Sequence, residues 1–523
     1  MNFQPRIFLF TIIALLLVLL SGCGSLHQTT QPVVTDLPTS IPTVALEIQL
    51  LTSAVPTKTH EKKPTQIPGM NDPKADQISS ASTSTPSLST SDFNVILGQP
   101  TANSISISLW SKSYTQVRIQ YGTAPGTCLS QTNPINLKAA EPQVVRLMNL
   151  APDTTYFYQV VGTINFPGEH TFHTQRNPGD TFTFTIDADP HYSDPNFNGQ
   201  LFEISLKNAL SDHPDFHIDL GDTFMTEKIN PHSLNDDISA YMNMRSYFSI
   251  LAADAPLFLV NGNHDGELGW LLSTHNNEPI WATQLRQLYF PSPSPNSFYS
   301  GANSPDPSLG TIRDAYYSWT WGDALFIILD PFWYSTSKPD PNDLNSNWRY
   351  TLGKAQYDWL KTTLESSSAK FKLVFIHNLV GGNDKDGRGG IEAAPYFEWG
   401  GLNADGTYGF DSHRPGWGVP IHDLLVQNHV SAVFHGHDHV FVKQELDGII
   451  YQEVPQPDIA RYDNTGLAAQ YGYVQGDALS SSGYLRLTVS TEKITVDYIR
   501  CFLPKDENND QQSGKVAYSY SIY

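Results

Sequence analysis

Cysteine is scarce in this sequence, with 3 residues in 523. Cys23, Cys128 and Cys501 lie far apart, so no pair has the short spacing of a zinc–thiolate site. Thiolate-bound zinc is therefore excluded as the basis of a functional site. Apart from Cys23, the sequence leaves two alternatives open: Cys128 and Cys501 form one disulfide, or both remain free thiols.

Positive charge is scarce as well. The chain has 31 Lys and Arg residues against 52 Asp and Glu residues, which gives a formal net charge of −21. Nucleic-acid backbones require a basic protein face, so this balance opposes a nucleic-acid partner. It does not exclude a small phosphorylated substrate, because metal ions can supply local positive charge. The 40% hydrophobic content indicates a folded protein, and its length suits two or three domains.

The one long hydrophobic run of the sequence stands at its N-terminus. Arg6 precedes IFLFTIIALLLVLL, and the run ends in the residues LSGC at Cys23. This order is typical of a secretory signal. The ending resembles the lipobox of bacterial lipoproteins, which implies that residues 1–23 are a signal peptide with Cys23 as the lipidated mature N-terminus. A plain signal peptide and an uncleaved anchor are the alternatives. We expect an exported protein that is anchored to the membrane by lipid and faces outside the cytoplasm.

Composition and periodicity divide the remaining chain. Residues 24–92 are rich in Ser, Thr and Pro, which predicts a disordered linker. Between 93 and 176, apolar residues alternate with polar ones, as in SISISLW, which predicts a β-sandwich. Between 181 and 500, short apolar runs alternate with helical patterns, which predicts an α/β fold with sheets covered by helices. Residues 501–523 are expected to form a tail or a last strand.

The segment LAPDTTYFYQV resembles the fibronectin type III signature. The matching residues are Leu150, Pro152, Thr154 and Tyr156. In that family the tyrosine fixes a corner between strands. The resemblance implies that residues 93–176 are a fibronectin type III-like domain, which we expect to be a structural spacer. A carbohydrate-binding module is the alternative, although no sugar-binding surface is identifiable.

Polar side chains follow five predicted strands of the α/β region. They are Asp189 and His191 in DPH, Asp222 in GD, Asn263 and His264 in GNHD, His377 in HN, and His437 and His439 in GHDH. Open α/β sheets place their sites at the carboxyl ends of strands, so these side chains are expected to meet. Asp, Asn and His suit Mn, Fe or Zn. Each motif alone is typical of a turn, but five in this order predict a metal site.

The ordered motifs resemble those of the calcineurin-like metallophosphoesterase family, D-x-H, G-D, G-N-H, H and G-H-x-H. The resemblance covers about residues 181–500 and implies a sandwich of two sheets flanked by helices, with two metal ions. It implies two overlapping ligand sets: Asp189, His191, Asp222 and His439 for one ion, and Asp222, Asn263, His377 and His437 for the other. Two ions about 3.5–4 Å apart can lower the pKa of a shared water, which then attacks a phosphoester as hydroxide.

The resemblance assigns no metal to His264. We expect His264 to protonate the leaving oxygen or bind the phosphate, with a supporting role behind the ligands as the alternative. A β-sandwich before the catalytic domain resembles the arrangement of purple acid phosphatases. Met225, however, stands where those enzymes have an iron-binding tyrosine and where calcineurin has an aspartate that orients the catalytic histidine. No iron–tyrosinate centre is therefore expected, and Asp265 is the candidate for orienting His264.

A glycine-rich segment between 381 and 418 follows His377. Long segments of this kind are usually functional loops or disordered, and we expect this one to lie over the site. Its cations are expected to bind a substrate phosphate, and its aromatic residues to form apolar walls: Lys385, Arg388, His413 and Arg414, and Tyr396, Phe397, Trp399 and Trp417. The alternative is that Arg388 and Arg414 pair with carboxylates and hold the loop together. A second insertion, 266–312, is expected to shape the rim.

These patterns predict an exported, membrane-tethered enzyme that hydrolyses phosphomonoesters or phosphodiesters. Two alternatives stay open: a catalytically silent surface-binding protein on the same scaffold, and a phosphodiesterase that acts on lipid headgroups or envelope polymers within reach of the tether. The sequence determines neither the substrate, nor the metals, nor the oligomeric state.

Overall fold

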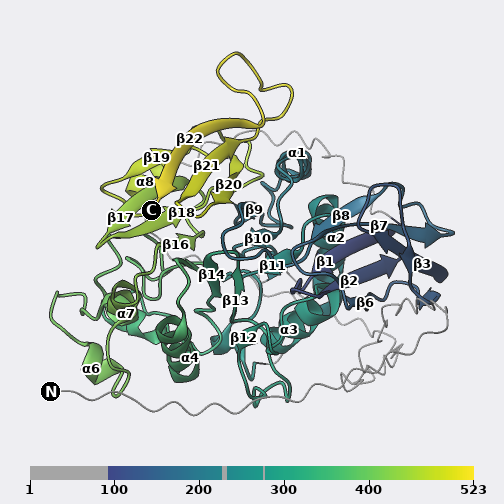
Figure 1. The fold of residues 1–523 in the computed structure, drawn as a ribbon. Coiled ribbons are helices and arrows are strands. Elements are labelled where there is room, and N and C mark those ends of the chain that lie inside the picture. The colour runs from purple at the N-terminus through teal and green to yellow at the C-terminus, as the bar shows by residue number, and fades with distance from the viewer. Residues whose placement is uncertain (1–91, 227–232, 275–276) are drawn as a thin grey trace, which may run out of the picture.

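The computed structural model describes residues 92–226, 233–274 and 277–523. The predicted signal peptide with Cys23 lies outside the described residues, as does the predicted linker up to residue 91. In the part of the chain that is described, no helix combines the length and the hydropathy needed to cross a membrane. A β-sandwich lies beside a larger α/β body that contains the rest of the described chain (Figure 1).

The β-sandwich consists of two antiparallel sheets. The smaller sheet has the order β1-β2-β6, with β1 (Phe93–Gly98), β2 (Ser104–Ser111) and β6 (Gln143–Met148). The larger sheet contains β4 (Ser130–Gln131), β3 (Thr115–Gly122), β7 (Thr155–Gly162), β8 (His170–His173) and β5 (Ile135–Leu137), which pairs with β3. The alternation of β2 predicted a half-buried strand, but both of its faces are buried.

The α/β body has two facing sheets, as the resemblance implied. One has six strands in the order β11-β10-β9-β20-β21-β22: β11 (Leu257–Leu259), β10 (His217–Asp219), β9 (Phe182–Asp187), β20 (Gly483–Val489), β21 (Ile494–Arg500) and β22 (Lys515–Ile522). Strands β9, β10 and β11 are parallel. The predicted last strand is β22, at the edge of this sheet.

The second sheet has eight strands in the order β12-β13-β14-β15-β16-β18-β17-β19. They are β12 (Ser300–Gly301), β13 (Tyr317–Trp321), β14 (Ala324–Ile328), β15 (Phe371–Phe375), β16 (Ala432–His435), β18 (Ile449–Glu453), β17 (Phe441–Leu446) and β19 (Asp477–Leu479). Strands β14, β15, β16 and β18 are parallel. Buried side chains such as Phe184, Phe326 and Phe375 fill the space between the two sheets.

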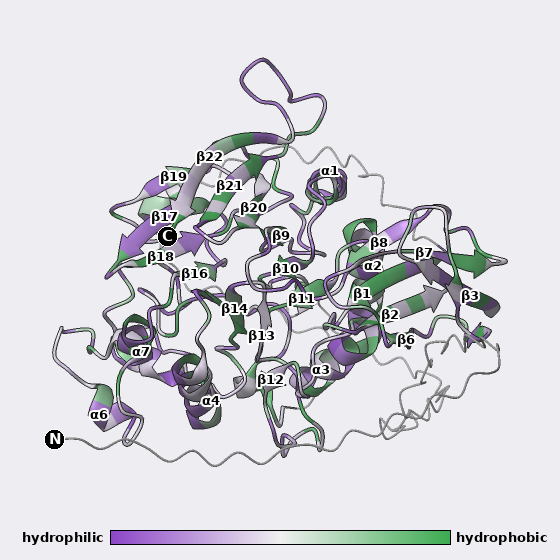
Figure 2. Ribbon diagram, viewed as in Figure 1, coloured by the Kyte–Doolittle hydropathy of each residue, from purple (hydrophilic) through white to green (hydrophobic). Residues whose placement is uncertain are grey.

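Helices cover the outer faces of the two sheets. The helices α1 (Gly199–Ser211), α2 (Leu234–Ala252) and α3 (Glu278–Tyr289) share one apolar cluster with residues of β20 and β21, and α4 (Lys354–Ser366) and α7 (Ile421–Gln427) cover the eight-stranded sheet. Short helical segments occur in loops: η2 (Gly269–Leu271), η3 (Ser346–Arg349), α5 (Phe397–Gly400), α6 (Phe410–His413) and α8 (Gly466–Gln470). Figure 2 shows that strands such as β1 are hydrophobic, whereas the loop between β21 and β22 is hydrophilic.

The sandwich and the α/β body share a buried interface along α2. Ile96 and Trp110 of the sandwich belong to the same apolar cluster as α1 and α2. The fully buried Arg245 of α2 donates from Nε to Asn94 Oδ1 (2.6 Å) and from Nη2 to the Ser108 carbonyl (2.6 Å). This contact explains why β2 is buried on both faces. Burial, which disfavours the charged form, lowers the pKa of Arg245 to about 9.

The cysteines of the described residues are not paired. Cys128 lies in the sandwich and is half-buried, whereas Cys501 follows β21 and is fully buried. Of the two alternatives that the sequence left open, the structure has free thiols.

Candidate metal centre

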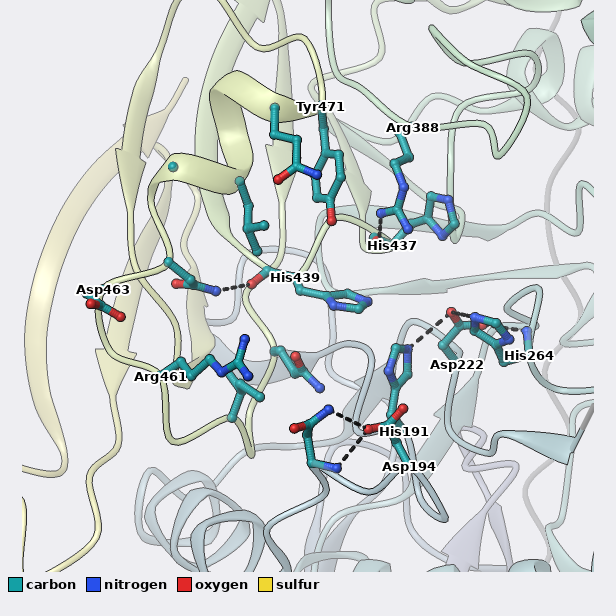
Figure 3. A pocket seen from close by; sticks show the side chains of 17 residues that line it. His191, Asp194, Asp222, His264, Arg388, His437, His439, Arg461, Asp463 and Tyr471 are labelled. Atoms are coloured by element: carbon teal, nitrogen blue, oxygen red, sulfur yellow. Dashed lines mark hydrogen bonds and ion pairs between the residues drawn. The ribbon is translucent and has the colours of Figure 1, made fainter. Parts of the chain in front are cut away.

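The two sheets each contribute one half of a side-chain cluster. Loops after the parallel strands β9, β10 and β11 carry five of the predicted residues, and loops after β15 and β16 carry three: Asp189, His191, Asp222, Asn263 and His264, and then His377, His437 and His439. Because the carboxyl ends of both sets of strands face a common cleft, residues as far as 248 positions apart in sequence form hydrogen bonds. Figure 3 shows several of these side chains converging.

The ligand atoms of the cluster fall into overlapping groups. Within each group the potential ligand atoms lie within 4.8 Å of one another, and the groups are Asp189 with His191 and His439, Asp222 with His377 and His437, and His191 with Asp222 and His264. The first two groups each contain three of the four residues in one of the two sets that the resemblance implied. Asn263 joins the second, because its Oδ1 lies 3.1 Å from His377 Nε2. The assignment of individual ligands stays a prediction.

The backbone of the cluster is held in an unusual conformation. Five non-glycine residues of the motifs have positive φ angles: Asp189 (61°), His191 (52°), Asp222 (52°), His437 (81°) and His439 (61°). Left-handed conformations of such residues cost free energy and concentrate at functional sites. In the first and last motifs they occur at alternate residues of a short loop, whose side chains belong to the cluster.

The glycines of the motifs permit close approach between loops. A Cβ atom at Gly436 would lie 2.6 Å from Asp189 Oδ2, and one at Gly262 would lie 2.3 Å from Asp222 Oδ1. The left-handed residues of the turn after Gly436 are His437 and His439. The role of Gly436 is to leave room for the carboxylate of Asp189, which accepts a hydrogen bond from the His437 amide (2.9 Å).

Hydrogen bonds to carbonyl groups fix which ring nitrogen of two histidines faces the cluster. His377 Nδ1 lies 2.9 Å from the Leu220 carbonyl, and His437 Nε2 lies 2.9 Å from the Asp386 carbonyl. A carbonyl only accepts, so each of these nitrogens carries the proton. The opposite nitrogens, His377 Nε2 and His437 Nδ1, lie 3.3 Å apart inside the cluster. Outer hydrogen bonds of this kind orient metal-binding histidines.

Burial and mutual charge shift the pKa values of the acidic residues in opposite directions. Burial acts to raise the pKa of Asp222, but His377, His264 and His191 outweigh it and hold this pKa well below its usual value. Burial raises the pKa of Asp189 to about 8, aided by the neighbouring Asp222 and opposed by His377. For His377, burial lowers the pKa, but Asp222 and Asp189 outweigh it and raise the pKa to about 9.

The imidazoles of His437 and His439 are held neutral. Burial is the main reason, and it lowers both pKa values well below the usual range. Neighbouring histidines and Arg388 lower them further. Neutral imidazoles and ionised carboxylates are the forms that bind metal ions. Two buried carboxylates and several imidazoles at hydrogen-bond distance, with lone pairs directed inward, fit divalent cations of the Mn, Fe or Zn type.

The comparisons with known proteins agree with this geometry. Residues 182–441 match the profile of the family described as calcineurin-like phosphoesterase. This segment is a calcineurin-like phosphoesterase domain. The chain is therefore a metal-dependent phosphoesterase by family. No curated protein matches the sequence.

Two solved structures have the same fold as this phosphoesterase. A structure described as PhoD aligns with a TM-score of 0.57 and 15% identity, over 79% of this chain and 88% of that one. Purple acid phosphatase PPD1 from yellow lupin (Lupinus luteus) seeds aligns with a TM-score of 0.53 and 14% identity, over 82% and 74% of the two chains. At these identities the likeness shows the fold alone.

His264 lies beside the predicted ligands of the phosphoesterase domain. Its backbone amide donates to Asp222 Oδ1 (2.7 Å), its Nε2 lies 3.8 Å from Asp222 Oδ2, and its ring meets that of His191 edge-on at 5.5 Å. About a fifth of its side chain is exposed, at 20%, so it can reach a ligand in the cleft. Met225 is fully buried.

The structure corrects the expectation for Asp265. Its carboxylate accepts from three backbone amides, those of Gly262 (2.7 Å), Asp222 (2.9 Å) and Phe224 (3.0 Å). Asp265 therefore joins the loops after β10 and β11, and it fixes the backbone next to His264 instead of the imidazole.

An open cavity of about 650 Å³ lies above the cluster. Its floor includes His191, Asp222, His264, His437 and His439 (Figure 3). One wall is a segment that the sequence analysis missed, between residues 456 and 471, which includes α8. This volume lies within the range of small-molecule sites, which is about 300–1,000 Å³.

Arg388 reaches this cavity, as predicted for the glycine-rich segment. Its Nη1 donates to the His437 carbonyl (3.0 Å) and lies 3.1 Å from Asp438 Oδ1, and its guanidinium lies 4.2 Å from the centre of the Tyr471 ring. Arg388 therefore pairs with a carboxylate, as one reading of the sequence had it, and also lines the cavity. Its contact with a substrate phosphate stays a prediction.

For Arg414 the structure bears out the alternative reading, in which the arginine pairs with a carboxylate, and not a place at the metal centre. Arg414 lines a separate hollow with Trp348 and Trp417, where it pairs with the buried Glu398 and donates to the Trp348 carbonyl (2.6 Å). It holds the loop together. The other predicted contacts of this segment also fail: Lys385 pairs with its neighbour Asp386 on the surface, His413 and Trp417 line the hollow of Arg414, and Phe397 and Trp399 are buried.

The described residues of the insertion 266–312 do not line the cavity. The insertion contains α3, which is tied to the loop after β11 through a buried ion pair between Arg286 and Glu267. Trp270 packs edge-on against Phe332 and Tyr350. The predicted rim is therefore a packed part of the body.

His435 has a structural role beside the cluster. It is buried, and its Nδ1 lies 2.7 Å from Glu453 Oε2 on β18. Glu453 Oε1 also accepts from the Asp438 amide (2.9 Å), and so it holds the turn between His437 and His439. Nothing in the local sequence of Glu453 indicated this role, because the contact forms only when β16 and β18 pair.

If Asp222 belongs to both ion sites, replacing it will remove more metal than replacing a residue of one group. We expect two metal ions per wild-type chain, about one in His437→Ala, and less than one in Asp222→Asn, since loss of a shared ligand weakens both sites. Metal content after dialysis, measured by mass spectrometry, tests this. His422→Gln is the control, because His422 contacts Tyr451 and Asp447 outside the cluster and should retain both ions. Equal losses in Asp222→Asn and His437→Ala would contradict the shared role.

Proposed function

We propose that this chain is an exported, membrane-tethered phosphoesterase that hydrolyses phosphomonoesters or phosphodiesters at a centre of two metal ions. The observation that supports it most directly is the pair of ligand groups, Asp189 with His191 and His439, and Asp222 with His377 and His437, on the floor of one open cavity. The predicted signal and lipid attachment at Cys23 support export and tethering.

In such a centre the metal ions supply the chemistry, and the chain holds the ions and their ligands in position. When bound, two ions act as Lewis acids on phosphoryl oxygens and on a water molecule. The ionised carboxylate of Asp222 keeps negative charge at the floor of the cavity, which stabilises cations there. The hydrogen bonds of His377 and His437 to main-chain carbonyls fix their rings before substrate binds.

His264 is the residue that we assign to the leaving group. It is part of the floor of the same cavity but belongs to neither predicted ligand set. An imidazole at this place can donate a proton to the oxygen that departs from phosphorus. The hydrogen bond from its amide to Asp222 fixes its backbone beside the ligands.

Two alternatives from the sequence remain in competition with this proposal. A silent binding protein on the same scaffold would hold the ions and ligands without turnover. A phosphodiesterase of lipid headgroups or envelope polymers would act on esters at the membrane, which the tether would bring within reach. The experiments below separate these readings.

The full chain loaded with Mn²⁺ or Zn²⁺ is expected to hydrolyse p-nitrophenyl phosphate, bis(p-nitrophenyl) phosphate or both. Asp222→Asn should lower the rate by at least about a hundredfold, because it weakens both ion sites. His422→Gln should retain the wild-type rate. Preference for the monoester would indicate a phosphatase, and preference for the diester a phosphodiesterase. A rate that rises when the ester is presented in phospholipid vesicles would favour a membrane substrate. A metal-loaded, folded protein that turns over neither ester would favour the binding alternative.

His264→Gln is expected to lower the rate of ester hydrolysis. The loss should be larger for an ester whose leaving group needs a proton. Alkoxide leaving groups require protonation whereas p-nitrophenolate does not, so hydrolysis of an alkyl phosphate should fall by about 10²–10⁴-fold and hydrolysis of the nitrophenyl ester much less. Rates for both esters on the wild type and His264→Gln, at equal metal content, measure this difference. Equal losses for both esters would assign His264 to phosphate binding or support of the ligands.

Replacing Cys23 by Ser should release the protein from the membrane. We expect wild-type chain expressed in a bacterial host to sediment with membranes and to incorporate labelled fatty acid, and Cys23→Ser to do neither, since the acyl chains provide the anchor. Cys128→Ser is the matched control. If Cys23→Ser incorporates no labelled fatty acid but still sediments with membranes, the N-terminus is an uncleaved anchor instead.

A further inference from the structure

The wall of the cavity between residues 456 and 471 is attached to the predicted metal centre. Asn464 Nδ2 donates to the His439 carbonyl (2.9 Å), and Asn464 Oδ1 accepts from the Ser481 amide (2.8 Å). Ser481 Oγ donates to the same His439 carbonyl (2.7 Å). The wall is therefore fixed relative to a residue of the floor, and side chains that project from it have a defined position above the cluster.

Arg461 projects from this wall without a protein partner. Among the arginines that the structure describes, it is the one whose guanidinium makes neither a hydrogen bond nor an ion pair. Arg388, also in the cavity, is by contrast bound to Asp438 and to the His437 carbonyl. The sequence has 52 acidic residues against 31 Lys and Arg residues, so an arginine that pairs with none of the described carboxylates is available for a ligand. The guanidinium offers five donors suited to a carboxylate or phosphate.

The nearest acidic residue in the wall does not neutralise Arg461. Asp463 lies two positions further along the chain and lines the same cavity, but the two side chains form no ion pair. In Figure 3, Arg461 extends toward the interior of the cavity, where His191 and His439 lie, whereas the carboxylate of Asp463 points away from it. The free positive charge is thus presented to whatever occupies the cavity.

We propose that Arg461 binds a second anionic group of the substrate, separate from the phosphoryl group that is cleaved. The inference rests on the proposed function and narrows it to phosphoesters that carry another phosphate or a carboxylate. The scissile phosphoryl group lies over the histidines of the floor, and the remainder of the substrate extends along the wall to Arg461. A cavity of about 650 Å³ has room for both groups.

The surroundings of Arg461 suit a moderately strong attraction to an anionic group. The side chain is exposed to solvent, so attraction to an anion is screened by salt. Ile459 and Leu467 of the same wall contribute apolar surface for the carbon skeleton between the two anionic groups. Arg461 therefore acts on specificity, and the hydrolytic step at the floor does not require it.

Inhibition by non-hydrolysable phosphonates tests this inference without knowledge of the natural ester. The ligands are propylphosphonate, with one anionic group, and two ligand series with spacers of different length, one ending in a carboxylate and the other in a second phosphonate. We expect the wild type to bind the best two-anion ligand about tenfold more tightly than propylphosphonate, as for one charge-assisted contact. The better series identifies the second group as carboxylate or phosphate.

Arg461→Ala should abolish this preference and leave the affinity for propylphosphonate unchanged. Arg461→Lys, which keeps the charge, should retain part of the preference. Arg349→Ala is the matched control, because it removes the same charge from an exposed arginine that lines the other hollow. Raising the salt concentration should weaken the preference of the wild type and have no such effect on Arg461→Ala.

Failure of this inference can be distinguished from failure of the proposed function. A wild type that hydrolyses a nitrophenyl ester but shows no preference at any spacer length, or the same preference in Arg461→Ala, overturns the inference and leaves the function intact. If neither ester is hydrolysed, calorimetric titration of the metal-loaded chain with the same phosphonates gives the same comparison. Retention of the preference in Arg461→Ala overturns the inference in that case too.

Discussion

The architecture of the site depends on one buried carboxylate, that of Asp222. Its side chain is fully buried, accepts the amide of His264, and lies within 3.3 Å of Nε2 of both His191 and His377. A carboxylate in such surroundings remains ionised only because positive charge is close. The surrounding imidazoles, the left-handed turns and the amide cradle of Asp265 all serve to keep this charge in one place.

Local sequence patterns predicted most of the framework, because the strands that carry the site are short apolar runs followed by ligand-type residues. The runs before Asp189, Asp222 and His377 all became parallel strands, and their carboxyl ends met. The family resemblance added the pairing of residues into two groups, which spacing alone could not have provided. The period-two pattern of β2 was detected, but the burial of its second face was not, since that face is covered by α2.

What the sequence could not provide were contacts between distant segments. Glu453 holds the turn of the last motif from a neighbouring strand, and Asn464 holds the His439 carbonyl from a loop beyond it. Neither residue stands in a recognisable motif. Arg414 shows the converse, because its position in a glycine-rich loop suggested a substrate contact, whereas its buried partner Glu398 is visible only in three dimensions. Charge near a motif is weak evidence for binding until its partners are known.

The interface along α2 changes how the N-terminal sandwich should be regarded. Arg245 inserts a charged group between the two parts and satisfies it with oxygen atoms of Asn94, Ser108 and Tyr289, and Ile96 and Trp110 fill the surrounding apolar layer. Removing the sandwich would leave this guanidinium without two of its acceptors and expose the apolar surface of α2 to water. The sandwich is thus an integral part of the folding unit and not a detachable spacer, so gene fragments that begin at the phosphoesterase domain would encode an aggregation-prone protein.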